Sequence, residues 1–262
     1  MPDETAQAAN LLWTGGWDST YRLLDLVLVQ GRAVQPYYFP DPVRASRQVE
    51  LRTMETIKAE VARRRPDAGA LIGDTIVIEA QDIPADPVID EQYERLRAAA
   101  YIGRQYASLA RMAKHHGLSR LELSVHVDDK LYDHLRGNIA ERDGIHALVD
   151  TPATADLEMF RPFVFPILRL TKIDMGARAA AAGFADLMEQ TWFCHAPDRK
   201  GRACGICNPC VYTIEEGLAR RVPWQNRVRY HARRVASPAT SFLARHRVRH
   251  RLKKLLRRGS RR

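Results

Sequence analysis

The amino-acid sequence predicts an α/β protein built on a doubly wound, mainly parallel sheet. Short apolar runs alternate with longer segments of helical periodicity, and this alternation is typical of parallel strands joined by helices on both faces. Chemically distinctive residues follow two of the apolar runs, at Gly15–Gly16 and after Val127. Ligands bind beyond the carboxyl ends of the strands in such sheets, so both positions are candidate sites.

The elements are expected in the following order. The first strand is predicted over Leu11–Trp13, and a buried helix then starts near Ser19 and is closed by Gly31. The elements that follow are a strand over Val34–Phe39, a charged helix over Ser46–Arg65, a strand over Asp74–Glu79, a helix over Tyr101–His116 and a strand over Arg120–Val127. The apolar segment Phe160–Leu170 precedes a helix predicted over Lys172–Ala182, which Gly183 ends.

Composition indicates a globular, cytoplasmic protein. The chain has 262 residues, 45% of them hydrophobic, and no apolar run approaches the 18 residues of a membrane span. The first ten residues are polar, so no secretory signal is expected. The expected division is a flexible N-terminus over 1–10, an α/β domain over 11–190, a cysteine-rich segment over 191–225 and a basic tail over 226–262. A homodimer is compatible with the sequence, although no feature specifies one.

The basic tail accounts for the net positive charge of the chain. It contains 12 Arg, 2 Lys and no acidic residue, so the rest of the chain has a net charge of −4. From Ser241 the tail has helical periodicity, with an apolar stripe formed by Ala244, Val248, Leu252 and Leu255. Such a helix is suited to salt-sensitive, nonspecific contact with RNA or an anionic surface. The alternative is a solvated appendage.

The stretch TGGWDST has the features of a phosphate-binding loop. A Gly-Gly turn exposes backbone N–H groups, and the helix that follows directs its positive end to the same place. Ser19 and Thr20 add hydroxyl donors, and Asp18 is suited to hold Mg²⁺. The sequence lacks G-x-x-x-x-G-K-[ST] and G-x-G-x-x-G, so P-loop and dinucleotide-binding functions are not supported. The alternative is a tight strand-to-helix turn with Asp18 as an N-terminal charge.

Four cysteines, the only ones in the chain, form a candidate metal site. Cys194, Cys204, Cys207 and Cys210 supply four thiolates for tetrahedral, structural Zn²⁺. An iron–sulfur cluster, disulfides and free thiols are the alternatives. His195 is expected to be a neighbour of the site, since four cysteines leave no coordination position open.

The Gly-Gly loop and the four cysteines together resemble motifs of the 7-cyano-7-deazaguanine synthases. These enzymes are N-type ATP pyrophosphatases of the PP-loop superfamily and act in the queuosine pathway. TGGWDST resembles their S-G-G-x-D-S loop, with Thr14 in place of serine. QTWFCHAPDRKGRACGICNPC and PILRLTKIDM resemble their C-terminal zinc signature and the segment before it. YIGRQYASLA resembles their P-G-R-N helix start, with Arg104 retained, Ile102 in place of proline and Gln105 in place of asparagine. The resemblance covers about residues 11–218.

The resemblance implies an adenine nucleotide alpha hydrolase-like fold and an ATP-dependent carbon–nitrogen ligase. Such an enzyme adenylates a 7-carboxy-7-deazaguanine-like carboxylate, releases AMP and pyrophosphate, and reacts the product with ammonia toward amide and nitrile. The implied ATP-binding residues are Thr14, Gly15, Gly16, Asp18, Ser19, Thr20 and Arg104. Asp18, Asp128 and Lys172 would act in catalysis, and Tyr132 and Arg136 would bind the acceptor. From the residues alone, the alternatives are that Asp128 or Asp129 caps a helix and that Lys172 is a solvated lysine at a helix start.

One motif departs from the family. Where the family has D-x-x-x-Y-x-D-C-R, this chain has DDKLYDHLR, with His134 and Leu135 in place of an aspartate and a cysteine. A paralogue that adenylates another acceptor is one alternative. A tRNA-modifying PP-loop enzyme is another, although thiolases of that kind need a catalytic cysteine that this chain lacks. A non-catalytic nucleotide- and zinc-binding relative is the third.

Overall fold

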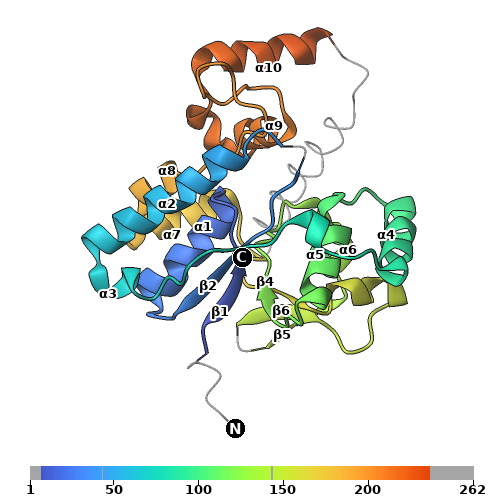
Figure 1. Cartoon of the computed structure of the whole chain (residues 1–262). Coiled ribbons are helices and arrows are strands. Elements are labelled where there is room, and N and C mark those ends of the chain that lie inside the picture. Colours follow the sequence, from blue (N-terminus) through green and yellow to red (C-terminus); the bar gives the residue numbers. More distant parts are fainter. Residues whose placement is uncertain (1–6, 43, 143, 237–262) are drawn as a thin grey trace, which may run out of the picture.

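The protein has a central seven-stranded sheet covered by helices on both faces (Figure 1). The computed structural model describes residues 7–42, 44–142 and 144–236. The strand order is β3-β2-β1-β4-β7-β6-β5. The strands span Ala9–Leu12 (β1), Val34–Tyr38 (β2), Ile76–Val77 (β3), Leu121–Glu122 (β4), Ile139–Arg142 (β5), Ile145–Leu148 (β6) and Phe163–Phe165 (β7). The five strands from β3 to β7 in this order are parallel, and β6 and β5 continue the sheet antiparallel. The predicted α/β class with a mainly parallel sheet is confirmed.

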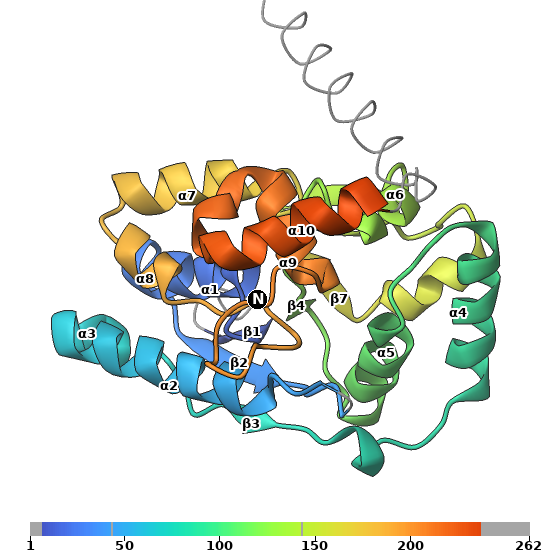
Figure 2. The same ribbon diagram turned by 90° about the horizontal axis from the view of Figure 1, so that it is seen from above.

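The helices form two cores, one on each face of the sheet (Figures 1 and 2). Successive β1 side chains point to opposite faces, so Leu11 packs in one core and Leu12 in the other. The first core includes residues of α1 (Trp17–Leu24), α2 (Arg47–Arg64), α7 (Lys172–Ala181) and α8 (Ala185–Glu189). The second includes residues of α4 (Pro87–Ala99), α5 (Gln105–His115), α6 (Lys130–Leu135) and the 3₁₀ helix η4 (Ala155–Phe160).

The shorter elements connect these layers. They are the π-helical turn η2 (Asp25–Val29), α3 (Pro66–Gly69), the 3₁₀ turn η3 (Ala80–Asp82), α9 (Asn208–Thr213), the π-helical turn η5 (Ile214–Leu218) and the 3₁₀ turn η6 (Ala219–Arg221). The last helix is α10 (Trp224–Ala236). Figure 1 shows α9 and α10 above the carboxyl ends of β1 and β2. Within the described ranges, none of the helices combines the length and apolar character needed to traverse a lipid bilayer.

The fourth predicted strand is much shorter than expected. Leu123 still donates its N–H to Val164 O at 2.9 Å, but Val125 N–H donates to Leu123 O at 2.8 Å. This i to i+2 bond is that of a γ-turn, and it turns the chain out of the ladder. The strand predicted over Arg120–Val127 is therefore observed only at Leu121–Glu122.

The two ends of the chain differ in part from the expected division. β1 begins at Ala9, inside the N-terminal segment expected to be flexible, and residues 1–6 lie outside the described residues. The boundary expected between 225 and 226 falls within α10, where Asn226 and Tyr230 are buried. The expected tail helix from Ser241 lies outside the described residues.

Candidate functional site

The Gly-Gly turn lies where β1 ends and α1 begins. Gly15 has φ +67°, a left-handed conformation that L side chains disfavour. A Cβ on Gly15 would also lie 3.2 Å from Glu50 O and from Met54 Cγ of α2. Gly16 is the N-cap of α1 and offers no side-chain cap. The first N–H groups of α1 thus face the turn, as an anion-binding site requires.

The hydroxyl groups of the loop have different environments. Ser19 Oγ accepts a hydrogen bond from Thr14 N at 3.3 Å and lies 3.3 Å from Thr14 Oγ1. Thr20 is fully buried, and its hydroxyl oxygen accepts a hydrogen bond from Trp13 Nε1 at 2.9 Å. Thr14 and Ser19 therefore shape the loop itself, whereas the Thr20 side chain joins the helix to the strand end.

Asp18 is the carboxylate at this turn. Its Oδ2 lies 3.5 Å from Lys172 Nζ and 4.0 Å from His126 Nε2. Among the described residues, its Oδ1 is buried and has no hydrogen-bond partner. A buried carboxylate oxygen without a partner is costly, so Asp18 is placed to receive a cation.

Lys172 joins three parts of the chain at one point. It is the first residue of α7, whose N-terminus is closed by a capping box between Thr171 and Asp174. Its Nζ lies 2.9 Å from Glu216 Oε2, in addition to its pairing with Asp18. Burial acts to lower the pKa of Lys172, but the carboxylates of Asp18 and Glu216 outweigh it and raise this pKa above its ordinary value. The site therefore holds an ammonium ion, as neutralisation of phosphate charge requires.

His126 and Glu216 are site residues that the sequence did not single out. His126 is 4% exposed, and its Nδ1 accepts a hydrogen bond from Asp128 N at 3.2 Å. In the neutral tautomer the proton is then on Nε2, the nitrogen that faces Asp18. Glu216 stands in a charged stretch, where no periodicity distinguishes it from Glu215.

The loop after β4 forms the adjoining wall. Asp129 is the N-cap of α6: its Oδ1 accepts a hydrogen bond from Leu131 N at 2.8 Å and one from Tyr106 OH at 3.2 Å. Burial and the charge of Asp129 raise the pKa of Tyr106, so its hydroxyl stays protonated and donates. Asp128 and Tyr132 are half-buried. The capping alternative therefore applies to Asp129.

The two substituted positions of this loop have different surroundings. Leu135 is fully buried in the core that includes α5. His134 Nε2 lies 3.3 Å from Tyr101 O, and this contact is exposed to solvent. Arg136 ends α6 and is exposed. Arg104 is the exposed N-cap of α5, and within the described ranges no hydrogen bond or ion pair joins it to the Gly-Gly loop. The structure thus brings Asp18, Lys172 and the Gly-Gly turn together without Arg104.

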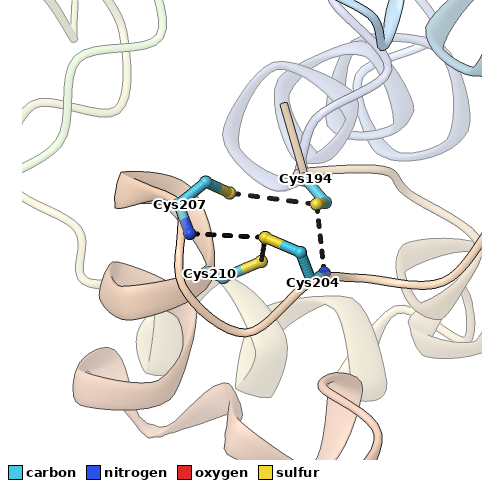
Figure 3. A group of neighbouring side chains, drawn as sticks. All are labelled: Cys194, Cys204, Cys207 and Cys210. Carbon is cyan, nitrogen blue, oxygen red and sulfur yellow. Dashed lines mark hydrogen bonds between the residues drawn. The ribbon is translucent and has the colours of Figure 1, made fainter. Parts of the chain in front are cut away.

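The four cysteines converge on one point (Figure 3). Their sulfur atoms all lie within 4.8 Å of one another, with Cys194–Cys207 and Cys204–Cys210 separations of 3.8 Å. A tetrahedral site with Zn–S bonds of about 2.3 Å has sulfur atoms about 3.8 Å apart, so the group could hold a metal ion such as zinc. Backbone N–H groups of Cys204, Ile206 and Cys207 point at sulfur atoms, and they favour the thiolate form.

The cysteine segment is attached directly to the Gly-Gly loop. Trp192 N–H donates to Gly15 O at 2.9 Å, two residues before the first cysteine. Arg221, which follows the cluster, lies 5.1 Å from the ring centroids of both Trp17 and Phe193. Burial lowers the pKa of Arg221 to about 10, while Glu189 acts in the opposite direction. The segment therefore packs on the first turn of α1.

Comparisons with known proteins do not identify the chain. No protein-family model matches it, and no curated protein sequence is significantly similar to it.

Proposed function

We propose that the protein is an ATP-dependent adenylating enzyme of the 7-cyano-7-deazaguanine synthase type. The observation that carries the proposal is Asp18: a carboxylate with an unpartnered buried oxygen, in the first turn of the helix after a Gly-Gly turn, beside the ammonium of Lys172. An anion-binding turn, a cation-binding carboxylate and a buried lysine at one strand end are the groups that Mg·ATP requires.

The proposed roles follow from these positions. Backbone N–H groups at Gly15, Gly16 and the first turn of α1 bind the phosphates that leave as pyrophosphate, and Ser19 holds the loop in shape. Asp18 binds Mg²⁺, and Lys172 neutralises charge on the phosphates. A carboxylate oxygen of the acceptor attacks the α-phosphorus, and the bond to the β-phosphate bridging oxygen breaks. We assign no phosphate contact to the Thr20 side chain, because it is fully buried between the helix and the end of the strand.

The acceptor is proposed to enter beside the loop after β4, near Asp128 and Tyr132. A 7-carboxy-7-deazaguanine-like acid would be adenylated there, and ammonia would displace AMP to give the amide. A second adenylation, on the amide oxygen, would allow loss of AMP with formation of the nitrile. Because Leu135 is a core residue, its difference from the family pattern affects packing, and His134 at the rim is the change nearer to solvent.

For the metal, we propose a single structural Zn²⁺ on Cys194, Cys204, Cys207 and Cys210. Sulfur separations of 3.8 Å support one ion, because the thiolates of a four-iron cluster bind different iron atoms and stand farther apart. The zinc would hold the cysteine segment folded against the Gly-Gly loop.

The test measures AMP and pyrophosphate released from Mg·ATP with 7-carboxy-7-deazaguanine and ammonium, with product masses read in parallel. The expected result is release of AMP and pyrophosphate, a nitrile product, and loss of both in Asp18→Asn. Release of AMP only with a different acceptor would indicate a paralogue. Zinc-loaded protein that binds no Mg·ATP would overturn the proposal in favour of a non-catalytic relative.

A further inference from the structure

Lys172 is held more closely by Glu216 than by Asp18. Its Nζ is 2.9 Å from Glu216 Oε2 and 3.5 Å from Asp18 Oδ2. All three side chains are largely buried, with exposed fractions of 15% for Lys172, 17% for Glu216 and 25% for Asp18. The two carboxylates therefore share the ammonium: Glu216 is the nearer, and both raise the pKa of Lys172.

The chain after Glu216 is built to bring this carboxylate to α7. Gly217 has φ +92°, and a Cβ on it would lie 2.9 Å from Ile173 Cδ1, the side chain next to Lys172. Leu218 is buried in the same core as Met175 of α7. An L residue at Gly217 would be strained by the positive φ, and the Ile173 side chain would have to move. The close approach that makes the Glu216–Lys172 pair thus depends on a specific backbone conformation.

The segment that contains Glu216 follows the cysteine cluster directly in the chain. Cys210 lies in α9, and η5, which contains Glu216, continues directly from α9. On the other side of the site, Trp192 joins the start of the cysteine segment to Gly15. Trp192, before the cysteines, and Glu216, after them, therefore both contact groups that are proposed to bind Mg·ATP.

We propose that Glu216 is a positioning residue that shares the Lys172 ammonium with Asp18, so that Asp18 remains available to a divalent cation. This inference rests on the proposed function, since it assigns Asp18 to the metal of the nucleotide. It assigns to the cysteine segment, through Glu216, a part in preparing the ATP site.

Lys172 and a divalent cation compete for the carboxylate of Asp18. If Glu216 is neutral, Asp18 is the nearest counter-ion left to the buried Lys172, and the ammonium moves toward it. A divalent cation must then displace the ammonium from Asp18 before it binds. We expect the cation concentration needed for half-saturation to rise about tenfold, which corresponds to about 1.4 kcal/mol.

Glu216→Gln tests this with a matched control in the neighbouring residue. Glu215 is exposed, and its Oε1 accepts a hydrogen bond from Tyr230 OH at 2.9 Å, so Glu215→Gln makes the same charge change away from Lys172. Mn²⁺ binding would be followed by electron paramagnetic resonance in the presence of α,β-methylene-ATP, which is not cleaved between its α and β phosphates. Zinc content and thermal unfolding of each variant would be checked first.

The expected result is an increase of about tenfold in the apparent Mn²⁺ dissociation constant for Glu216→Gln, with wild-type affinity for Glu215→Gln. At saturating Mn²⁺ the nucleotide affinity of Glu216→Gln should return to the wild-type value, which is the signature of competition and not of a damaged site. Glu216→Asp keeps the charge on a shorter side chain and should give an intermediate constant, so it serves as the test if Glu216→Gln does not fold.

Two results would contradict the inference, and they are distinguishable. If wild-type protein binds Mn²⁺ and nucleotide but Glu216→Gln behaves as Glu215→Gln does, the positioning role of Glu216 is wrong and the proposed function stands. If wild-type protein binds neither, the proposed function of the Gly-Gly loop fails and the inference fails with it.

Discussion

Arg22 of α1 and Glu122 of β4 form a buried, bidentate ion pair. Arg22 Nε lies 2.6 Å from Glu122 Oε2, and Arg22 Nη2 lies 2.8 Å from Oε1. The side chains are 7% and 4% exposed. The pair joins α1, which begins at the Gly-Gly turn, to β4, and the loop after β4 contains His126. It therefore fixes two walls of the candidate site relative to each other.

Glu122→Ala is expected to lower the free energy of unfolding by about 3 kcal/mol. The substitution leaves a buried guanidinium with Asp25, 3.2 Å from Arg22 Nη1, as its remaining partner. Arg22→Met combined with Glu122→Leu should cost less than Glu122→Ala alone, because both buried charges are removed and Asp25, 22% exposed, keeps its hydrogen bond from Gln30 Nε2. Urea denaturation measures all three values. A double variant less stable than the single one would contradict the argument.

Gly15→Ala is expected to destabilise the protein more than Gly31→Ala. Both glycines have positive φ, +67° and +63°, so both substitutions bear a left-handed strain of about 1–2 kcal/mol. A Cβ at Gly31 meets no atom within 4 Å, whereas at Gly15 it would lie 3.2 Å from Glu50 O and Met54 Cγ. The loop must therefore shift in Gly15→Ala, and binding of Mg·ATP should weaken in that variant alone. Calorimetric titration with nucleotide and urea denaturation separate the two effects, and equal nucleotide affinity in both variants would contradict this explanation.

Purified protein is expected to contain one zinc ion per chain, and Cys207→Ser is expected to lose it. Three thiolates remain in the variant, too few for a closed structural site. Because Trp192 N–H donates to Gly15 O, unfolding of the cysteine segment should also weaken Mg·ATP binding. Elemental analysis and nucleotide titration of the same samples test both statements. Stoichiometric iron with visible absorption would contradict the assignment to zinc.

The parts of the site that were predicted from the sequence are those with a local signal. The Gly-Gly turn lies between an apolar run and a helical segment, and the four cysteines lie within 17 residues. Lys172 lies in PILRLTKIDM, the segment that resembles the family's. In each case, residues close together in the sequence carry the chemistry.

The parts that were missed depend on distant contacts or on residues with weak patterns. Glu216 and Lys172 are 44 residues apart in the sequence, and the chain turns at Gly217, next to Glu216, with a positive φ. Hydrophobic periodicity does not predict this contact. β4 is short because of the bond between Val125 N–H and Leu123 O. The β5–β6 hairpin and the charged helix α4 were not predicted, although Asp86 before Pro87 is an N-terminal helix signal.

Lys172 is expected to stabilise the folded protein through neutral and mildly alkaline pH and to lose this contribution at high pH. Burial acts against its charge, but the carboxylates of Asp18 and Glu216 raise the pKa of Lys172 above the ordinary lysine value of about 10.4. A group whose pKa is higher in the folded than in the unfolded state binds its proton more tightly when folded. Its contribution is therefore complete below the unfolded pKa and is lost as the pH rises through the folded pKa.

The measurement is the free energy of unfolding of wild-type protein and of Lys172→Met from pH 7 to pH 11. The difference between them should be constant from pH 7 to about pH 9 and should decrease above about pH 10.4, where the unfolded lysine loses its proton. Lys200→Met is the control, since Lys200 is exposed, and it should leave the free energy of unfolding nearly unchanged at pH 7. A difference for Lys172→Met that increases with pH would mean that the ammonium is not the stabilising form. Asp18 and Glu216 would then not act as its counter-ions.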